Sequence, residues 1–312
     1  MKIAFYYPSQ NIVKKDLIFL EYLPEITISH NKCDSSCDMI YVATLSKLPE
    51  AIRAKEQFNK PLVCWVWDLP FNSQTDWDLT PLGLRDNASR PQACRNQASL
   101  LHKCDKLISA SKWTQQTIKD NYGLDSDQMY FYINPQEFDM VPNQPKTNRI
   151  SQISRYAWNK KWENTLYAGA NLDYELSLIG VRHTPTYYDY MKKHLTSNTR
   201  MYENIPRTEI IKLLKSSEVL VSPSVFEGWG ISPIEALYCD TAVLISDLPV
   251  FQEVYEDAVL YHDRFDKDDM KEKLEMLTKD KGLQNKIIKQ GKLKIQDFTP
   301  ERFAKQFKEV VL

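Results

Sequence analysis

The sequence predicts an α/β protein made of two doubly wound domains, each a parallel sheet with helices on both faces. The first observation behind this prediction is that short apolar runs alternate with stretches of helical composition along most of the chain, as in parallel strands covered on both sides. The second is the length of 312 residues, which is enough for about two domains of ordinary size. The third is the segment Val141 to Asn148, which has two prolines and no apolar periodicity and therefore indicates an interdomain linker.

In the first half of the chain, the apolar runs predict buried strands at residues 3–7, 39–43, 62–67, 106–110 and 129–133. Helices are expected between them at residues 16–22, 49–59, 92–102 and 113–121. The helix at 49–59 is marked by a proline in its first turn.

In the second half, the same alternation predicts strands at residues 150–156, 174–179, 219–222 and 242–246. Helices are expected at residues 162–170, 207–216 and 233–238, and over most of the chain from Lys267 onward, where Met270, Leu274 and Leu277 recur at helical spacing. Because doubly wound sheets bind ligands beyond the carboxyl ends of their strands, we expect the site in a cleft between the two domains.

Composition excludes several classes of protein. Forty basic and 41 acidic residues give a net charge of -1, which argues against electrostatic binding of nucleic acid over the whole surface. No run of about 18 apolar residues is present, so a membrane span is not expected, although peripheral association stays open. Early polar residues argue against a signal peptide, so a cytoplasmic protein with reduced cysteines is expected. The chain has only 8 glycines, which nearly excludes a glycine-rich phosphate loop.

No metal site is expected. The cysteines and histidines do not form paired C-x2-C groups. Asp76-Trp77-Asp78 has the D-x-D form of a metal motif, but it lies in a polar segment rather than after an apolar strand. We interpret it as a loop near the cleft.

The segment from Ser222 to Glu235 has the pattern of an anion site. It follows an expected buried strand and holds two of the glycines, Gly228 and Gly230, two residues apart. Glycine lets backbone N–H groups approach a ligand closely. Ser232 is expected as the N-cap of the next helix, with Pro233 at its first position. The N-terminus of that helix would favour a negatively charged group such as a diphosphate.

Structural explanations compete with this functional one. Ser232-Pro-Ile-Glu235 fits the S-x-x-E pattern, so Glu235 could simply close a capping box. Glu227 gains little structurally between Phe226 and Gly228 at a strand end, which favours a functional role. Arg155 and Lys160, taken singly, could be exposed loop charges.

Pro-Ser-x-x-Glu-Gly-x-Gly, with a second glutamate eight residues after the first, resembles the E-x7-E signature of the family 4 retaining glycosyltransferases of the GT-B fold. Further matches, covering most of residues 105–262, are Ser154-Arg155-Tyr-Ala-Trp-Asn-Lys160, Leu178-Ile-Gly180, Pro249 to Val254, Ser109 to Trp113 and Ile133 to Asp139. The resemblance implies two Rossmann-like domains facing a central cleft. Residues 1–145, completed by a C-terminal helix at 298–312, would form the acceptor-side domain, and residues 150–297 would bind the nucleotide-sugar donor.

The resemblance also implies roles for individual residues. Glu227, Arg155 and Lys160 would be catalytic: the two cations would hold the donor diphosphate, and Glu227 would contact the donor sugar. The remaining residues implied to bind substrate are Gly228, Trp229, Gly230, Ile231, Glu235, Ser224, Lys161 and Asp68. Within that set, Glu235 would bind the ribose hydroxyls and Lys161 would replace Lys160 if the register slips by one. The base pocket is expected near Tyr202 to Ile205.

Some aromatic side chains are candidates to contact the sugar. Trp229 is the first of these and is expected to face the cleft, and Trp67 and Trp77 come after it. The chain departs from the family where Trp65 to Asp68 occupies the usual place of a histidine. It departs again where Pro135 and Asp240 stand in place of glycines, and residues 8–12 lack the usual glycine pair.

The function implied is metal-independent, retaining transfer of a hexose from a nucleoside-diphosphate sugar to a hydroxyl acceptor. The acceptor could be a glycan, a lipid-linked sugar, a protein or a modified base. The nucleotide sugar is a co-substrate, and no cofactor is expected. Two alternatives are a GT-B-like nucleotide-sugar epimerase and a non-catalytic sugar-nucleotide-binding module. The few histidines lie outside the motif segment, which disfavours the epimerase because that reaction needs acid/base groups near the sugar.

Overall fold

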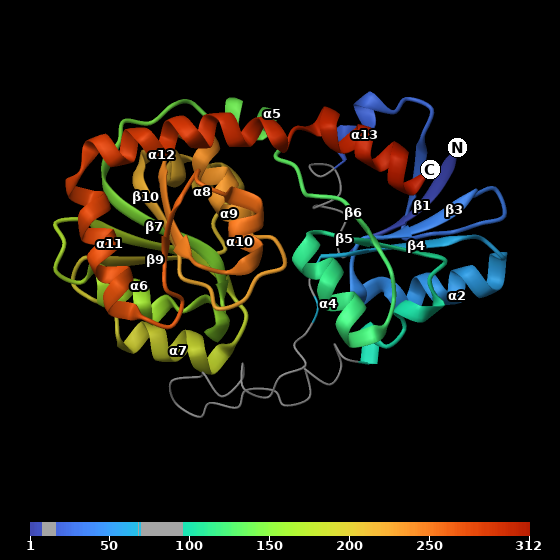
Figure 1. The fold of residues 1–312 in the computed structure, drawn as a ribbon, viewed down its shortest axis with the longest axis horizontal. Helices are drawn as coiled ribbons and strands as arrows, with labels where there is room; N and C mark the ends of the chain where they lie inside the picture. The colour runs from blue at the N-terminus through green and yellow to red at the C-terminus, as the bar shows by residue number, and fades with distance from the viewer. Residues whose placement is uncertain (8–16, 68, 70–95) are drawn as a thin grey trace. The chain divides into compact units, whose positions relative to one another are not determined.

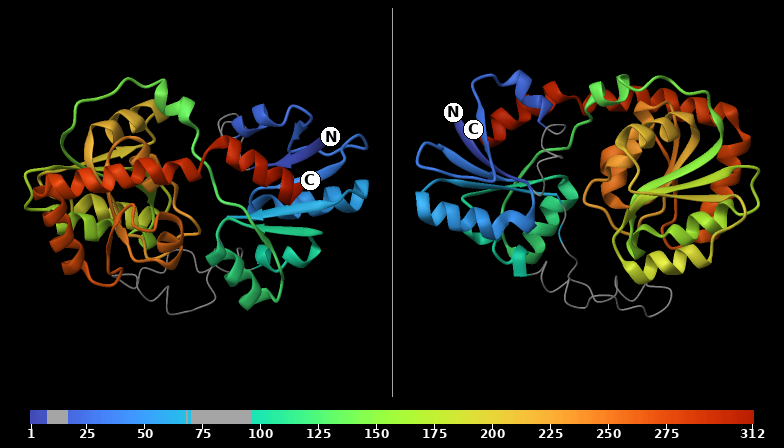
Figure 2. Two further views of the ribbon diagram at one scale, coloured as in Figure 1. Left: turned by 45° about the horizontal axis from the view of Figure 1, so that its top comes forward. Right: turned by 180° about the vertical axis from the view of Figure 1, so that it is seen from behind.

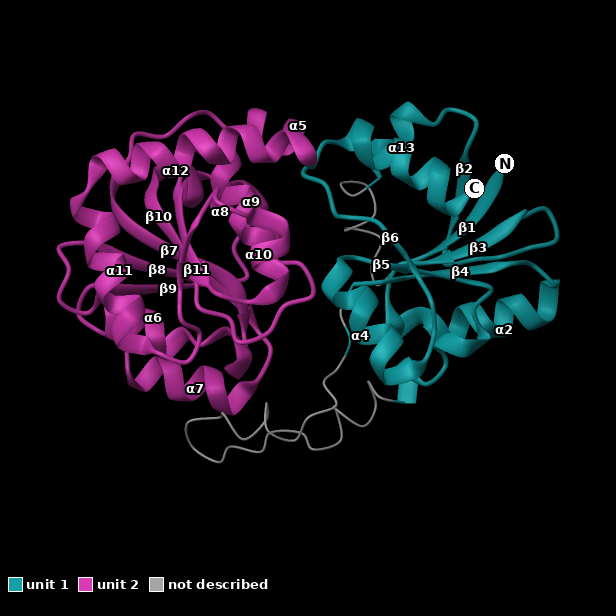
Figure 3. Cartoon of the chain, viewed as in Figure 1, with its two compact units in different colours: residues 1–79, 87–134, 298–312 teal, residues 80–86, 135–297 magenta. Residues whose placement is uncertain are grey.

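The computed structural model describes residues 1–7, 17–67, 69 and 96–312, and these form two compact units (Figures 1 and 3). Within the described ranges, the first unit comprises residues up to Asn134 together with Phe298–Leu312, and the second comprises Pro135–Asp297. Asp68, Trp77 and the Asp76–Asp78 motif lie outside the described residues, as does the segment 8–12.

The first unit is built on a six-stranded parallel sheet with the order β2-β1-β3-β4-β5-β6. The strands are β1 (Lys2–Tyr6), β2 (Thr27–His30), β3 (Met39–Val42), β4 (Leu62–Val66), β5 (Lys106–Ser109) and β6 (Asp127–Gln128). The helices are α2 (Leu48–Phe58), α4 (Lys112–Tyr122) and α13 (Pro300–Val311), with 3-10 turns at Ile18–Tyr22, Leu45–Lys47 and Leu101–Lys103. β2 was not expected, because Thr27–His30 is not a continuous apolar run.

Both faces of this sheet are buried, as the apolar runs predict. Successive residues of β1 enter opposite core clusters, Ile3 and Phe5 on one side and Ala4 and Tyr6 on the other, because side chains alternate along a strand. Helix α13 covers the first of these faces, and its Phe307 is fully buried. The end of the chain therefore completes the first unit.

The second unit contains a six-stranded parallel sheet with the order β12-β11-β10-β7-β8-β9. Its strands are β7 (Thr147–Tyr156), β8 (Glu175–Arg182), β9 (Thr199–Glu203), β10 (Ser217–Ser222), β11 (Ala242–Ser246) and β12 (Leu260–His262). Its helices are α5 (Pro135–Asp139), α6 (Trp162–Gly169), α7 (Pro185–Lys193), α8 (Arg207–Ser216), α9 (Ile231–Tyr238), α10 (Pro249–Tyr255), α11 (Lys267–Lys279) and α12 (Lys281–Lys294). Figure 2 shows these helices on both faces of the sheet.

The order of strands in the second unit fixes where a ligand can bind. The chain runs from β7 outward to β8 and β9, then returns to the other side of β7 and runs outward through β10, β11 and β12. This reversal makes the β7–β10 pair a topological switch point, and the crevice beyond the carboxyl ends of such a pair is the general ligand site of open α/β sheets.

The boundary between the units lies earlier than the expected linker. Helix α5 belongs to the second unit, where its Phe138 is buried 5.1 Å from the ring of Tyr238. Lys146, in the segment expected to be a linker, is fastened there too, because its Nζ donates to Ser217 O, Cys239 O and Thr241 Oγ1 at 2.7, 3.0 and 2.9 Å. Burial lowers the pKa of Lys146 to about 8.

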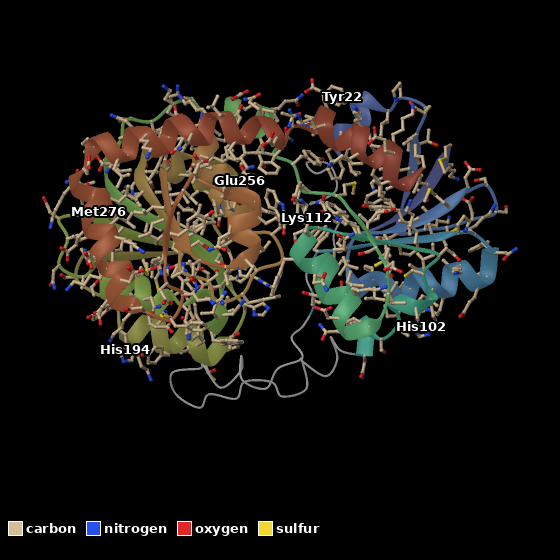
Figure 4. All side chains as sticks on the ribbon, in the orientation of Figure 1. Tyr22, His102, Lys112, His194, Glu256 and Met276 are labelled. Carbon is tan, nitrogen blue, oxygen red and sulfur yellow. The ribbon has the colours of Figure 1, made fainter. Side chains whose placement is uncertain are left out.

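The helical pattern from Lys267 onward is confirmed. Met270, Leu274 and Leu277 are buried along one face of α11, as residues at helical spacing are expected to be. Met276, labelled in Figure 4, is exposed. Within the described part of the chain, no helix has the length and apolar character needed to cross a membrane.

Candidate functional site

The loops that follow β7 and β10 form one structure at the switch point. The backbone N–H of Val225, in the loop after β10, donates to the carbonyl oxygen of Asn159, in the loop after β7, at 2.9 Å. The two loops are adjacent because β7 and β10 are paired in parallel. Residues that are distant in the sequence thereby meet at one edge of the sheet.

Lys160 and Glu227 form an ion pair between these loops. Lys160 Nζ lies 2.5 Å from Glu227 Oε1, and the two side chains are 7% and 18% exposed. Ser224 Oγ also donates to Glu227 Oε1, at 2.9 Å. Three residues named from the sequence are therefore in direct contact. A buried cation beside a half-buried carboxylate is an arrangement that costs desolvation free energy.

The backbone of Lys160 is held from inside the unit. Gln152 Nε2, on β7, donates to the carbonyl oxygen of Lys160 at 2.7 Å, and Thr165 Oγ1, on α6, donates to Gln152 Oε1 at 2.6 Å. Both bonds are buried, so they fix the loop strongly. Lys161 takes a left-handed φ of 46°, and its Nζ lies 3.7 Å from Glu163 Oε1. The structure thus assigns the Glu227 contact to Lys160 rather than to Lys161.

Arg155 is exposed near the end of β7, and its Nη1 lies 3.3 Å from His183 Nε2. The sequence reasoning did not single out His183. The signal that could have found it is its position directly after β8, whose Val181 pairs with Arg155 across the sheet. The structure therefore brings an imidazole to the guanidinium that was predicted to bind diphosphate.

Helix α9 begins two residues earlier than expected. It runs from Ile231 with Gly230 as its N-cap, and no side chain of the described residues accepts a hydrogen bond at this cap. The assignment of Ser232 as N-cap is therefore wrong, since Ser232 lies inside the first turn, and the capping-box explanation of Glu235 fails with it. Ile231 is exposed at the start of the helix.

Gly230 is required at this cap. Its φ is +84°, and an added Cβ would overlap Phe251 Cε1 on α10, so no other residue fits without strain. The carbonyl oxygen of Gly230 accepts a hydrogen bond from Tyr255 OH. Gly180, at the predicted strand end, is needed for another reason: a Cβ there would overlap the backbone oxygen of Ser154.

The tryptophan side chains do not lie as expected. Trp229 is 2% exposed, with its ring 6.1 Å from that of Tyr255, so the expectation that it faces a cleft is wrong. The large indole between Gly228 and Gly230 contributes more apolar area to the core than any other side chain could, which explains its burial. Trp67 is half-buried and packs 5.5 Å from the ring of Tyr7 in the first unit.

Glu235 is buried, at 8% exposure, and is held by Arg207. Arg207 Nη2 binds Glu235 Oε1, and Arg207 Nη1 lies 3.2 Å from Glu235 Oε2. A second carboxylate, Glu137 Oε2, accepts from Arg207 Nε at 3.1 Å. Burial lowers the pKa of Arg207, but the charges of the two glutamates outweigh it and raise that pKa above its ordinary value. The sequence reasoning missed Arg207 and Glu137, because their separation from Glu235 gives no local signal.

Among the residues that the structure describes, no three His, Cys, Asp or Glu side chains are grouped so that they could hold a metal ion. The chemistry available at the switch point is therefore that of Lys160, Arg155, Glu227, Glu235 and the first backbone amides of α9. This set combines positive charge with one buried carboxylate, Glu235, and one half-buried carboxylate, Glu227, which suits a ligand carrying both phosphate and hydroxyl groups.

Comparison with known proteins shows which family and fold the chain shares. The profile of the family described as "Glycosyl transferases group 1" matches residues 135–294, about half of the chain. The O-antigen chain mannosyltransferase RfbU of Salmonella typhimurium is 26% identical over 231 residues, or 68% of this chain. This chain spans only 63% of that relative.

Two solved structures share the fold over essentially the whole chain. HepE of Anabaena, in complex with UDP and glucose, has a TM-score of 0.77 at 14% identity and covers 100% of this chain and 99% of its own. Sucrose-phosphate synthase of Thermosynechococcus elongatus has a TM-score of 0.78 at 14% identity and covers 100% and 98%. With the two parallel sheets described above, these likenesses confirm the prediction of two Rossmann-like domains of the GT-B fold.

Proposed function

Because the chain belongs to the group 1 glycosyl transferases, we propose that it moves a hexose from a nucleoside-diphosphate sugar to a hydroxyl acceptor. The transfer retains the anomeric configuration and needs no metal. The observation that carries this proposal is the buried Lys160–Glu227 pair beside the start of α9, at the switch point of the second sheet.

The charges at the site suit the departure of a nucleoside diphosphate. As the bond between the sugar and the diphosphate breaks, negative charge gathers on the phosphate oxygens. Arg155 can bind those oxygens with two parallel hydrogen bonds, and Lys160 acts as a point charge. The amides at the start of α9 add the positive end of a helix dipole. Fixed charges of this kind stabilise a leaving group without a metal ion.

The carboxylates suit the rest of the donor. In this proposal Glu227, held by Lys160 and Ser224, contacts the sugar, and Glu235 accepts hydrogen bonds from the ribose hydroxyls. The named relatives support a hexose donor of this class, since RfbU is a mannosyltransferase and HepE has been solved with UDP-glucose.

The test begins with a thermal-shift screen of UDP-, GDP- and ADP-hexoses, because a ligand that binds the native state alone raises its stability. Transfer or slow hydrolysis of the donor that binds is then measured for Glu227→Gln. We expect turnover to fall about a hundredfold or more, as when a charged contact made at the transition state is lost.

The control is Glu218→Gln, on β10, because Glu218 Oε2 also pairs with a lysine, Lys281, at 2.6 Å but lies outside the site. This variant should keep wild-type turnover. EDTA should leave transfer unchanged, and the hexose released first should keep the anomeric configuration of the donor, as followed by NMR. Metal-dependent transfer, inversion, or full activity of Glu227→Gln would refute the proposal.

The same experiment separates the two alternatives. An epimerase would convert the nucleotide sugar with no acceptor present, and His183 beside Arg155 supplies an acid/base group that such a reaction could use. A binding module would take up the nucleotide sugar and leave it intact. Appearance of an epimer, or binding without any turnover, would replace the transferase assignment.

A further inference from the structure

Arg207 lies between two carboxylates and uses its whole guanidinium group to hold them. Its Nη1 and Nη2 bind the two oxygens of Glu235, and its Nε donates to Glu137 Oε2 at 3.1 Å. The guanidinium carbon also lies 5.2 Å from the ring centroid of Phe138, within the range of a cation–π contact. These contacts restrict Arg207 to one orientation.

Three helices meet at this arginine. Glu137 and Phe138 lie on α5, Arg207 is the first residue of α8, and Glu235 is on α9. Figure 1 shows the three helices next to one another in the second unit, and α5 is tied to α9 by the bond from Tyr238 OH to Asp139 Oδ1 at 2.8 Å. Arg207 is therefore held from α5 while it holds Glu235 on α9.

The ion pair leaves Glu235 able to bind a ligand. An ionised carboxylate has about four lone-pair positions, and the two bonds from Arg207 occupy two of them. The other two can accept hydrogen bonds from a pair of neighbouring hydroxyls, such as the 2′- and 3′-hydroxyls of a ribose.

Stability alone does not account for the cluster. Replacing a buried ion pair by apolar side chains of similar volume is often neutral or stabilising. Glu235 has no capping role in α9, as described above, so its charge is not needed to start that helix. A charged carboxylate kept in one orientation is, however, what recognition of a diol requires.

We propose that Arg207 is the positioning residue for ribose recognition: it fixes Glu235 in the orientation that accepts hydrogen bonds from the ribose of the nucleoside-diphosphate donor. Arg207 itself does not touch the nucleotide. This inference rests on the proposed function, and it adds a residue on which discrimination between ribose and deoxyribose depends.

The test takes the nucleoside diphosphate (UDP, GDP or ADP) whose hexose binds in the thermal-shift screen, and compares its affinity with that of its 2′,3′-dideoxy form by calorimetry on the full chain. In the wild type, loss of the two hydroxyls should weaken binding about tenfold to a hundredfold, the range for hydrogen bonds to a charged group. In Arg207→Met this ratio should fall to within about threefold of one, as it should in Glu235→Ala. Arg207→Lys should restore it only in part, because an ammonium cannot bind both oxygens in one plane.

The control is Arg149→Met. Arg149 Nε binds Glu175 Oε1 at 3.2 Å, and Arg149 lies near the start of β7, far along the strand from the switch point. This variant should keep the wild-type ratio, whatever its effect on the melting temperature. A melting curve of each variant separates lost binding from lost folding, and Arg207→Lys keeps the test available if Arg207→Met does not fold.

The outcomes are distinct. If Arg207→Met, or Arg207→Lys in its place, lowers both affinities or the melting temperature but keeps the wild-type ratio, Arg207 is only a structural residue and the inference is wrong. If Glu235→Ala also keeps the ratio, the ribose is not recognised at this cluster. If the wild type binds none of the UDP-, GDP- or ADP-hexoses of that screen, the proposed function fails, and this inference fails with it.

Discussion

The Lys160–Glu227 ion pair gives the sharpest prediction of stability. Lys160→Met removes the cation that lies 2.5 Å from Glu227 Oε1 and leaves the carboxylate with the hydroxyl of Ser224. Loss of one partner of a buried pair costs roughly 3–5 kcal/mol. Because Glu227 is 18% exposed, water can solvate the carboxylate in part, so we expect the low end of that range, about 3 kcal/mol.

The double variant tests whether this cost comes from the pair. Glu227→Gln keeps an oxygen that can accept from Lys160, but it leaves an ammonium that is only 7% exposed without its counter-charge, so it should cost about as much, roughly 3 kcal/mol. Lys160→Met combined with Glu227→Gln should cost less than the sum of the two single changes, with a coupling of about 1–3 kcal/mol. Glutamine at position 227 carries no charge, so removing the Lys160 ammonium from beside it costs less free energy than removing it from beside the glutamate.

The assay is amide hydrogen exchange by mass spectrometry on peptides from β7 and β10. Exchange in these core strands reports the opening of the second unit by itself, which a whole-chain melt of a protein with two units does not. The matched control is Lys281→Met, whose exposed amine pairs with Glu218 and should cost under about 1 kcal/mol. If Lys160→Met costs no more than Lys281→Met, or if the two changes are simply additive, the pair is not the buried interaction described here.

Three further predictions follow from single contacts. Gly230→Ala forces a Cβ into Phe251 at a φ of +84° and should lower the free energy of unfolding of the second unit by about 1–3 kcal/mol more than Gly123→Ala lowers that of the first. Gly123 has a φ of +66°, but its added Cβ meets nothing within 4 Å; equal losses, measured by hydrogen exchange in the core strands of each unit, would contradict this. The pKa of Lys146 is lowered to about 8 from 10.5, so between these pH values the unfolded chain binds more protons than the folded one. The wild type should therefore gain stability relative to Lys146→Met as pH rises from 8 to 10.5. Urea titrations along that range check the sign, and a stability difference that does not change with pH would refute it. The rate of donor hydrolysis in Chelex-treated buffer with EDTA should equal the rate with added Mg²⁺, since fixed cations supply the charge. A lower rate in the EDTA buffer would show a metal requirement.

Much of the fold could be predicted because its signals are local. A buried parallel strand is a short apolar run, and a helix shows its spacing within three turns, so most elements of both units were found where the structure has them. β2 was missed for the same reason, since an edge strand with the sequence Thr27–His30 carries no apolar run. The boundary at Pro135 was also missed, because the attachment of α5 and Lys146 to the second unit depends on distant residues.

The candidate site was predicted in part. The resemblance around Glu227 named Ser224 and Glu235, and the separate match from Arg155 onward named Lys160. The structure places Lys160 and Ser224 against Glu227. The assignment of Ser232 as a cap was wrong, because Gly230, with its positive φ, starts α9 two residues earlier. The expected outward position of Trp229 was wrong, because no local pattern reports which side of a loop is covered by α10.

The sequence by itself determined which segments form strands and helices and which residue types follow the strands. Both can be recognised from patterns that extend over only a few residues. Only the tertiary structure decided which strands are neighbours. Pairing of β10 with β7 brings Lys160 to Glu227, and packing of α5, α8 and α9 brings Arg207 between Glu137 and Glu235. These contacts join residues far apart in the chain, and their free energy comes from packing and desolvation that no local segment contains.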